Sequence, residues 1–130
     1  MPQSNLEVVQ AAYAAFLRGD MDSLPEYFDP DVVWHVPGRS AMAGAIEGRA
    51  NVIAALTDVA ALIAAGTVRL EVHDVLASGD HVVGLISEHA ERDGKAFDDN
   101  FAQVIHVKDG RVTESWNLYT DLYARDEFWA

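Results

Sequence analysis

The chain has 130 residues, half of them hydrophobic, and its 21 Asp and Glu against 9 Lys and Arg give a formal charge of −12. This length supports a single hydrophobic core, so we expect one domain over residues 1–130. The basic residues are scattered, whereas phosphate binding needs clustered positive charge. We therefore expect no nucleic acid and no membrane surface as a partner.

The chain contains no cysteine. Disulfide bridges, thiolate metal sites and a cysteine nucleophile are therefore excluded, and the composition is typical of a reducing compartment. No apolar run reaches the roughly eighteen residues that a bilayer span requires, and the polar N-terminus shows no leader. We accordingly expect a cytoplasmic protein.

The first elements are predicted to be helices. Ser4 and Glu7 have the spacing of a capping box, which indicates that a helix begins there. Apolar residues then recur on one face as far as Gly19, whose conformational freedom favours a helix end. A second, short helix is expected over residues 20–27.

A short strand and a long helix follow. Residues 32–36 alternate, with Val33 and His35 on one face and Trp34 on the other. Residues 39–48 have the Gly, Ala and Ser content of a loop, and long loops often form functional lids or rims. An Ala-rich helix is then expected over residues 49–65.

The second half of the chain predicts four antiparallel strands. A period of two begins at Thr67 and slips at His73-Asp74, which indicates a β-bulge. Asp-Gly between two β-rich runs is a strong hairpin signal, and such pairs stand at residues 93–94 and 109–110. The later strands are expected over residues 82–91, 97–107 and 111–119, and a C-terminal helix over residues 122–130.

This order of elements predicts an α+β fold. We expect a strongly bent antiparallel sheet with about three helices packed on its concave face. Such a sheet cannot close completely under the helices, so it forms a cone that is open at one end. A small ligand would bind inside this cone.

Several stretches of the sequence resemble motifs of one family. They are Arg18-Gly19-Asp20, the run from Phe28 to Trp34, Gly44 with Gly48, and the run from Asp109 to Trp116 with Asp121 beyond it. Together they resemble the nuclear transport factor 2-like superfamily, and within it the SnoaL-like polyketide cyclase and ketosteroid isomerase branch. The resemblance covers nearly the whole chain and implies a cystatin-like cone. It implies no single activity, because this fold hosts isomerases, cyclases, epoxide hydrolases, dehydratases and domains without catalysis.

The resemblance to ketosteroid isomerases implies candidate site residues. The carboxylate base of the isomerases corresponds to His35, a side chain suited to proton transfer near neutral pH. Their protonated carboxylic acid corresponds to Gln103, which can still donate an amide hydrogen to a developing oxyanion. Their tyrosine on the first helix lies about one residue from Tyr13. Two of the three positions carry different chemistry, so steroid isomerisation itself is not expected.

Two other branches are compared in the same way. The epoxide hydrolases carry Arg-x-Asp on a middle strand, where this chain has Glu88-His89, and Asp on the last strand, where it has Asn117. Both differences argue against that activity. The SnoaL-like cyclases place an acid/base Asp late in the chain, for which Asp121 is the candidate. Asp121 is equally suited to cap the C-terminal helix.

Alternation along the strands, taken with the family register, assigns side chains to the two faces of the sheet. Asn117 and Tyr119 would face the cavity, which leaves Trp116 and Leu118 on the outer face, where such proteins commonly dimerise. The residues expected to join the inner face are Ile86, Glu88, Ala90, Asp99, Phe101 and Gln103. A buried Glu88 or Asp99 would be a candidate proton donor or acceptor.

The leading hypothesis is a cofactor-free cone that binds a small, apolar, carbonyl-bearing molecule and catalyses a proton transfer, such as isomerisation, cyclisation or dehydration. His35 would be the base and Asp121 a further catalytic candidate. The substrate oxygen would be polarised by Tyr13, Gln103 and Asn117, and the remaining binding residues would be Trp34, Glu88, Phe101 and Tyr119.

The rival hypothesis is a non-catalytic ligand-binding or dimerisation module of the same fold, whose cone is filled by its own side chains. The enclosed volume separates the two hypotheses. In both cases we expect a homodimer through the outer sheet face. No metal is expected, because the histidines lack the spacing that favours zinc.

Overall fold

The computed structural model describes residues 4–130. These residues form three α-helices, one 3-10 helix and six strands. In chain order they are α1 (Asn5–Leu17), η1 (Leu24–Tyr27), β1 (Phe28–Val36), β2 (Gly44–Glu47), α2 (Arg49–Ala64), β3 (Val68–Ser78), β4 (His81–Arg92), β5 (Lys95–Lys108), β6 (Arg111–Tyr119) and α3 (Leu122–Phe128).

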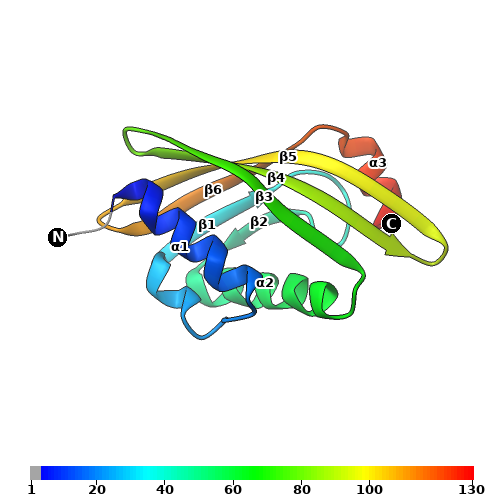
Figure 1. Ribbon diagram of the computed structural model, residues 1–130, viewed down its shortest axis with the longest axis horizontal. Coiled ribbons are helices and arrows are strands. Elements are labelled where there is room, and N and C mark those ends of the chain that lie inside the picture. Colours follow the sequence, from blue (N-terminus) through cyan, green and yellow to red (C-terminus); the bar gives the residue numbers. More distant parts are fainter. Residues whose placement is uncertain (1–3) are drawn as a thin grey trace.

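The six strands form one sheet in the order β2-β1-β6-β5-β4-β3. Neighbouring strands are antiparallel, apart from β1 and β6, which run parallel. The sheet arches over α1 and α2, and α3 lies at one end of the long strands (Figure 1). The predicted α+β cone is therefore confirmed. The parallel pair joins strands far apart in the sequence, so no tight turn dictates their relative direction.

The two Asp-Gly turns close the hairpins of the central strands. Asp93 and Asp109 both have φ of 52°, and the glycine after each has φ of 76°. Positive φ at both central residues is what a two-residue type I′ hairpin requires. Together with a register shift of the β5–β6 pair between His106 and Val107, these turns align Gly84 of β4, Gln103 of β5 and Asn117 of β6 in one row across the inner face.

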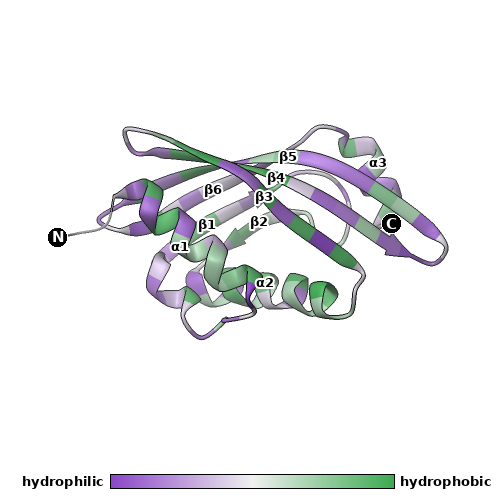
Figure 2. Ribbon diagram, in the orientation of Figure 1, coloured by the Kyte–Doolittle hydropathy of each residue, from purple (hydrophilic) through white to green (hydrophobic). Residues whose placement is uncertain are grey.

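The helices contribute apolar faces to the inside of the cone. The capping box of α1 is present, because the Ser4 hydroxyl accepts from the Glu7 amide at 3.2 Å and the Glu7 carboxylate accepts from the Ser4 amide at 3.2 Å. Figure 2 shows hydrophobic residues along both α1 and α2. The main core joins buried residues of these helices to the sheet, among them Val8, Val9, Val32, Val52, Val82 and Ile105.

Three local expectations differ from the structure or are refined by it. Residues 44–47, expected in a loop, form β2 and pair with β1; four residues are too few for a periodic pattern to be visible. The short helix expected over residues 20–27 is a single 3-10 turn. The bulge predicted at His73-Asp74 is confirmed by a register shift between Val72 and Asp74.

Within residues 4–130, no helix is both long enough and apolar enough to cross a membrane.

Gly84 provides a test of the packing between α1 and the sheet. A Cβ atom at this position would lie 2.0 Å from the Tyr13 hydroxyl oxygen. We expect Gly84→Ala to lower the free energy of unfolding by about 1–3 kcal/mol, as overpacking of a core does. In a Tyr13→Phe background the cost should be smaller, because the nearest atom is gone. Urea denaturation of the wild type, the two single variants and the double variant measures the loss of unfolding free energy caused by Gly84→Ala in each background. Equal losses in the two backgrounds would contradict this packing.

Candidate functional site

The cone encloses a cavity of about 360 Å³. Its walls come from α1, α2, α3, β1 and the inner faces of β3 to β6, and they are mainly aliphatic and aromatic. Representative lining residues are Phe16, Leu56, Leu70, Ile86, Phe101 and Trp129. This volume lies within the range of about 300–1,000 Å³ that is usual for small-molecule sites. The interior is therefore hollow and not filled by its own side chains.

A hydrogen-bonded set of polar side chains interrupts the apolar wall; we call it the amide network. The Tyr13 hydroxyl donates to Oε1 of Gln103 at 2.8 Å, and Nε2 of Gln103 donates to Oδ1 of Asn117 at 3.0 Å. The Trp34 indole donates to the same Oδ1 at 3.0 Å. Nδ2 of Asn117 donates to the Tyr119 hydroxyl oxygen at 2.9 Å. All five side chains line the cavity.

The fold explains how these five side chains meet. Gln103 and Asn117 are cross-strand partners on the inner face, because the β5–β6 pairing shifts by one residue between His106 and Val107. Tyr13 reaches Gln103 from α1 through the space above Gly84, which has no side chain to block it. Burial raises the pKa of Tyr13, so its hydroxyl stays protonated and serves as a hydrogen-bond donor.

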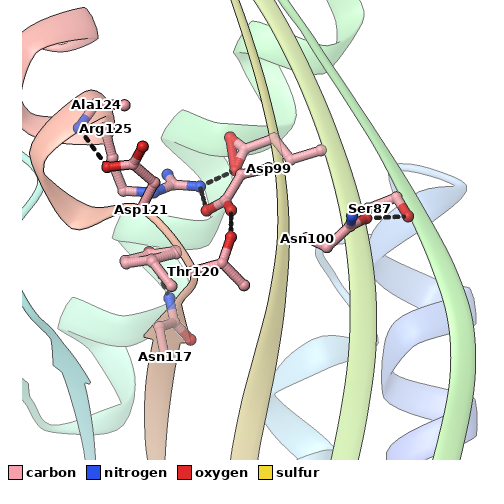
Figure 3. Close-up of polar contacts among 10 residues, drawn as sticks. Ser87, Asp99, Asn100, Asn117, Thr120, Asp121, Ala124 and Arg125 are labelled. Atoms are coloured by element: carbon pink, nitrogen blue, oxygen red, sulfur yellow. Dashed lines mark hydrogen bonds and ion pairs between the residues drawn. The ribbon is translucent and has the colours of Figure 1, made fainter.

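A second polar group lies where α3 meets the sheet, and we call it the Arg125 cluster. Nη2 of Arg125 contacts the Glu88 carboxylate and lies 3.4 Å from Oδ2 of Asp99. The Thr120 hydroxyl donates to Oδ1 of Asp99. Figure 3 shows Arg125 reaching from α3 toward Asp99, with Thr120 beside the same carboxylate. The guanidinium also lies 3.6 Å from the centroid of the Tyr119 ring.

The charges of the Arg125 cluster do not cancel. The side chains of Arg125, Glu88 and Asp99 are 8%, 7% and 1% exposed, so one buried cation faces two buried carboxylates. Both oxygens of Asp99 are engaged, one by Thr120 and one by Arg125. Glu88 lines the cavity, and among the described residues only its Oε1 is engaged. Oε2 of Glu88 therefore has no hydrogen-bond partner among the described residues.

A loop forms part of the cavity rim. Ser40, Ala41, Met42 and Ala43 line the cavity. Oδ1 of Asp126, on α3, accepts from the backbone amides of Arg39 at 2.9 Å and Ser40 at 3.2 Å. The helix that carries Arg125 therefore also anchors the rim.

His35 lies on the opposite face of β1 from the cavity. Its Nε2 is 2.6 Å from Oε2 of Glu114, and its ring stacks on Trp116 with the centroids 5.2 Å apart. The neighbouring residue Trp34 is the one that lines the cavity. The expectation that the His35 ring projects into the cone is therefore wrong. Both faces of β1 are covered, so its sequence pattern could not show which face is concave.

Asp121 acts as the N-cap of α3. Its Oδ1 accepts from the Ala124 amide at 3.0 Å, a contact drawn in Figure 3. The side chain is exposed and is not among the residues that line the cavity. The capping alternative is therefore confirmed, and the acid/base role has no support from the geometry.

The other residues proposed from the sequence do line the cavity. They are Tyr13, Trp34, Glu88, Phe101, Gln103, Asn117 and Tyr119. Their chemical roles stay predictions. Among residues 4–130, no group of three or more His, Asp or Glu side chains is arranged to hold a metal ion.

Sequence reasoning missed Arg125. It was counted only among scattered basic residues, yet it precedes Phe128 by three residues and Trp129 by four, so all three share one helix face. Both aromatic residues are buried. A lone arginine on the apolar face of a short terminal helix was the signal that would have found it. Tyr123, on the same helix, is 91% exposed.

Comparisons with known proteins agree with this architecture. Residues 9–115 match the SnoaL-like domain family. The uncharacterized protein Rv0034 of Mycobacterium tuberculosis is 40% identical over 128 residues, which is 98% of this chain and 97% of that protein.

Solved structures share the fold of this chain. The structure of Bal32a, from a soil-derived mobile gene cassette, is 41% identical and covers 97% of this chain and 96% of its own, with a TM-score of 0.88. An NTF2-like protein from Burkholderia xenovorans LB400 is 24% identical with a TM-score of 0.81, covering 100% of this chain and 98% of its own, and that likeness concerns the fold alone. Because the family match spans most of the chain, this protein belongs to the SnoaL-like family, with the nuclear transport factor 2-like fold.

Proposed function

We propose that this protein binds a small, mainly apolar molecule with a carbonyl oxygen and catalyses a proton transfer on it, with Glu88 as the acid/base group. The observation that carries the proposal is that one apolar cavity contains both the donors of the amide network and a buried carboxylate with an available oxygen. The reaction class is that of isomerases, cyclases and dehydratases, and no cofactor is required.

The chemistry follows from the two polar groups. The substrate's carbonyl oxygen would accept hydrogen bonds from the amide network, while Glu88 removes a proton from the carbon next to the carbonyl. The electron pair of the broken C–H bond would then move onto the oxygen, and the donors would stabilise the resulting enolate. In a substrate with a neighbouring C=C bond, return of the proton from Glu88 to the far carbon of that bond completes an isomerisation. In a substrate with a second carbonyl group, the α-carbon of the enolate bonds to that carbonyl carbon, the C=O π bond breaks, and the resulting alkoxide takes the proton from Glu88, which closes a ring.

Glu88 takes the role that the sequence resemblance implied for His35. The His35 ring contacts Glu114 and Trp116 outside the cone, so it cannot reach a ligand in the cavity. The Arg125 guanidinium contacts both Glu88 and Asp99, so it partly neutralises the two buried carboxylates.

The alternative function is a non-catalytic ligand-binding or dimerisation module of the same fold. A hollow interior favours ligand binding over a cone filled by its own side chains. Binding without catalysis would need no available carboxylate, and this separates the alternatives experimentally.

We further propose a homodimer through the outer sheet face, in the reducing environment of the cytoplasm. Cross-strand pairing places Leu76, Val83, Val104 and Trp116 in one row on that face. A second row joins Leu85, Ala102 and Leu118. Leu76 and Leu118 are 52% and 53% exposed. An apolar strip of this kind fits a second copy of itself across a two-fold axis.

The catalytic proposal predicts exchange of substrate protons with solvent. Acetylnaphthalene, a two-ring ketone, serves as the ligand, and loss of its methyl proton signal in heavy water is followed by NMR. We expect the protein to accelerate the exchange above the buffer rate. Glu88→Gln should lower the acceleration by about 100-fold or more, because general-base catalysis typically contributes 10²–10⁴-fold.

The matched control is His35→Gln, which changes a titratable residue outside the cavity. It should exchange the ketone protons within about twofold of the wild-type rate. A residue that lowered the activation free energy by about 1.4 kcal/mol would change the rate tenfold when removed. Exchange that survives Glu88→Gln but is lost in His35→Gln would overturn the assignment. Saturating binding with no exchange above buffer would instead favour the non-catalytic module.

The dimer proposal predicts a charge-sensitive interface. Light scattering at micromolar concentration should give the mass of two chains for the wild type. Leu118→Glu should give the mass of one chain, because it places a charge at the centre of an apolar contact. Tyr123→Glu adds the same charge at an exposed site on α3 and should remain dimeric. A monomeric wild type would contradict the proposal.

A further inference from the structure

The hydrogen bonds of the amide network have one possible direction, and Trp34 determines it. An indole N–H can only donate a hydrogen bond. Nε1 of Trp34 lies 3.0 Å from the amide of Asn117, so the atom that faces it must be the carbonyl oxygen, Oδ1. This contact is buried. The orientation of the Asn117 amide is therefore fixed by chemistry.

The orientation of the Asn117 amide determines the donor and the acceptor in the hydrogen bonds of Gln103 and Tyr13. The Gln103 atom that lies 3.0 Å from the same Oδ1 must be the donor, Nε2. Oε1 of Gln103 consequently faces Tyr13, whose hydroxyl must donate to it at 2.8 Å. The Tyr13 hydroxyl has one proton, and it donates that proton to Gln103, so it has none to donate to a ligand.

The orientation of the Asn117 amide also determines the donor and the acceptor in its hydrogen bond with Tyr119. Nδ2 of Asn117 faces the Tyr119 hydroxyl oxygen at 2.9 Å, so the amide donates and Tyr119 accepts. Among the described residues, no acceptor lies within hydrogen-bond distance of the Tyr119 proton. Tyr119 lines the cavity, so this proton is available to a ligand.

We propose that Tyr119, and not Tyr13, is the hydroxyl donor that binds the ligand's oxygen, with Trp34 as the positioning residue that makes it so. The inference rests on the proposed function, because it specifies which group holds the substrate oxygen. It also specifies the ligand chemistry at this wall: an acceptor such as a carbonyl oxygen fits, whereas an ammonium group does not.

The surroundings of Tyr119 suit it to this role. Burial raises its pKa, while the Arg125 guanidinium over its ring and the hydrogen bond with Asn117 both act to lower the pKa. The net direction is upward, so the hydroxyl keeps its proton. The hydrogen bonds that end at Tyr119 are aligned donor to acceptor, an arrangement in which each bond strengthens the next.

Two matched ligands test the proposal. Acetylnaphthalene carries a carbonyl oxygen, and isopropenylnaphthalene has a methylene group in its place with nearly the same shape. Titration calorimetry measures both affinities, and infrared spectroscopy measures the carbonyl stretch of the bound ketone. For the wild type we expect the ketone to bind about five- to tenfold more tightly than the hydrocarbon, the worth of one hydrogen bond. Its carbonyl stretch should lie below the value in an apolar solvent.

The variants Tyr119→Phe and Tyr13→Phe remove one hydroxyl each and keep both rings. Tyr119→Phe should abolish the preference for the ketone and return the carbonyl stretch to its value in an apolar solvent. Tyr13→Phe should retain both effects, because the Gln103 amide is still held by Asn117. Trp34→Phe should weaken both effects, because the Asn117 amide loses the contact that orients it. Circular dichroism checks that each variant is folded.

Three outcomes would overturn the proposal. Loss of the carbonyl shift in Tyr13→Phe but not in Tyr119→Phe would assign the donor to Tyr13. Equal affinities and an unshifted stretch in the wild type would show that the ligand oxygen is not bound by a donor, while ligand binding itself stands. If neither compound binds, the proposed function fails together with this inference.

Discussion

The structure depends on the register of β4, β5 and β6, which two Asp-Gly turns and one β-bulge set together. Both residues of each turn have positive φ, so the hairpins close with two-residue loops. Between β5 and β6 a register shift next to the turn then moves the pairing by one residue, and this shift brings Asn117 opposite Gln103. A shift of one residue would move every inner side chain to the outer face. Gln103 and Asn117 would then face solvent, and Trp116 would enter the cone. The site therefore depends on the two turns and on the β5–β6 bulge together.

The polar groups inside the cone are of two energetic kinds. In the amide network each recorded donor has an acceptor, so its burial carries little penalty. The Arg125 cluster is different, because two buried carboxylates share one guanidinium and the Arg125 Nε has no partner among the described residues. Buried ion pairs of this kind contribute little to stability compared with apolar packing. Their presence beside the cavity is better explained by a role in ligand binding or catalysis than by a contribution to the stability of the fold.

Much of this architecture was predictable from local patterns. The hairpins followed from Asp-Gly between β-rich runs, and the inward placement of Gln103 and Asn117 followed from alternation with the family register. The face of β1 was not predictable, because it carries apolar residues on both sides and its parallel partner β6 is distant in sequence. Arg125 was missed because its partners, Glu88 and Asp99, meet it only through the docking of α3. Contacts between elements that are distant in the sequence are not visible in the local residue pattern of either element.

In the proposed reaction one ligand contacts both polar groups at once, with its oxygen at the amide network and its reacting carbon at Glu88. A crystal structure of the protein with acetylnaphthalene decides whether it does. We expect the ketone oxygen to lie within hydrogen-bond distance of the Tyr119 hydroxyl and the methyl carbon to lie beside the Glu88 carboxylate. A ketone that lies outside the cone, or inside it with its oxygen toward the apolar wall, would show that no ligand joins the two groups in this way.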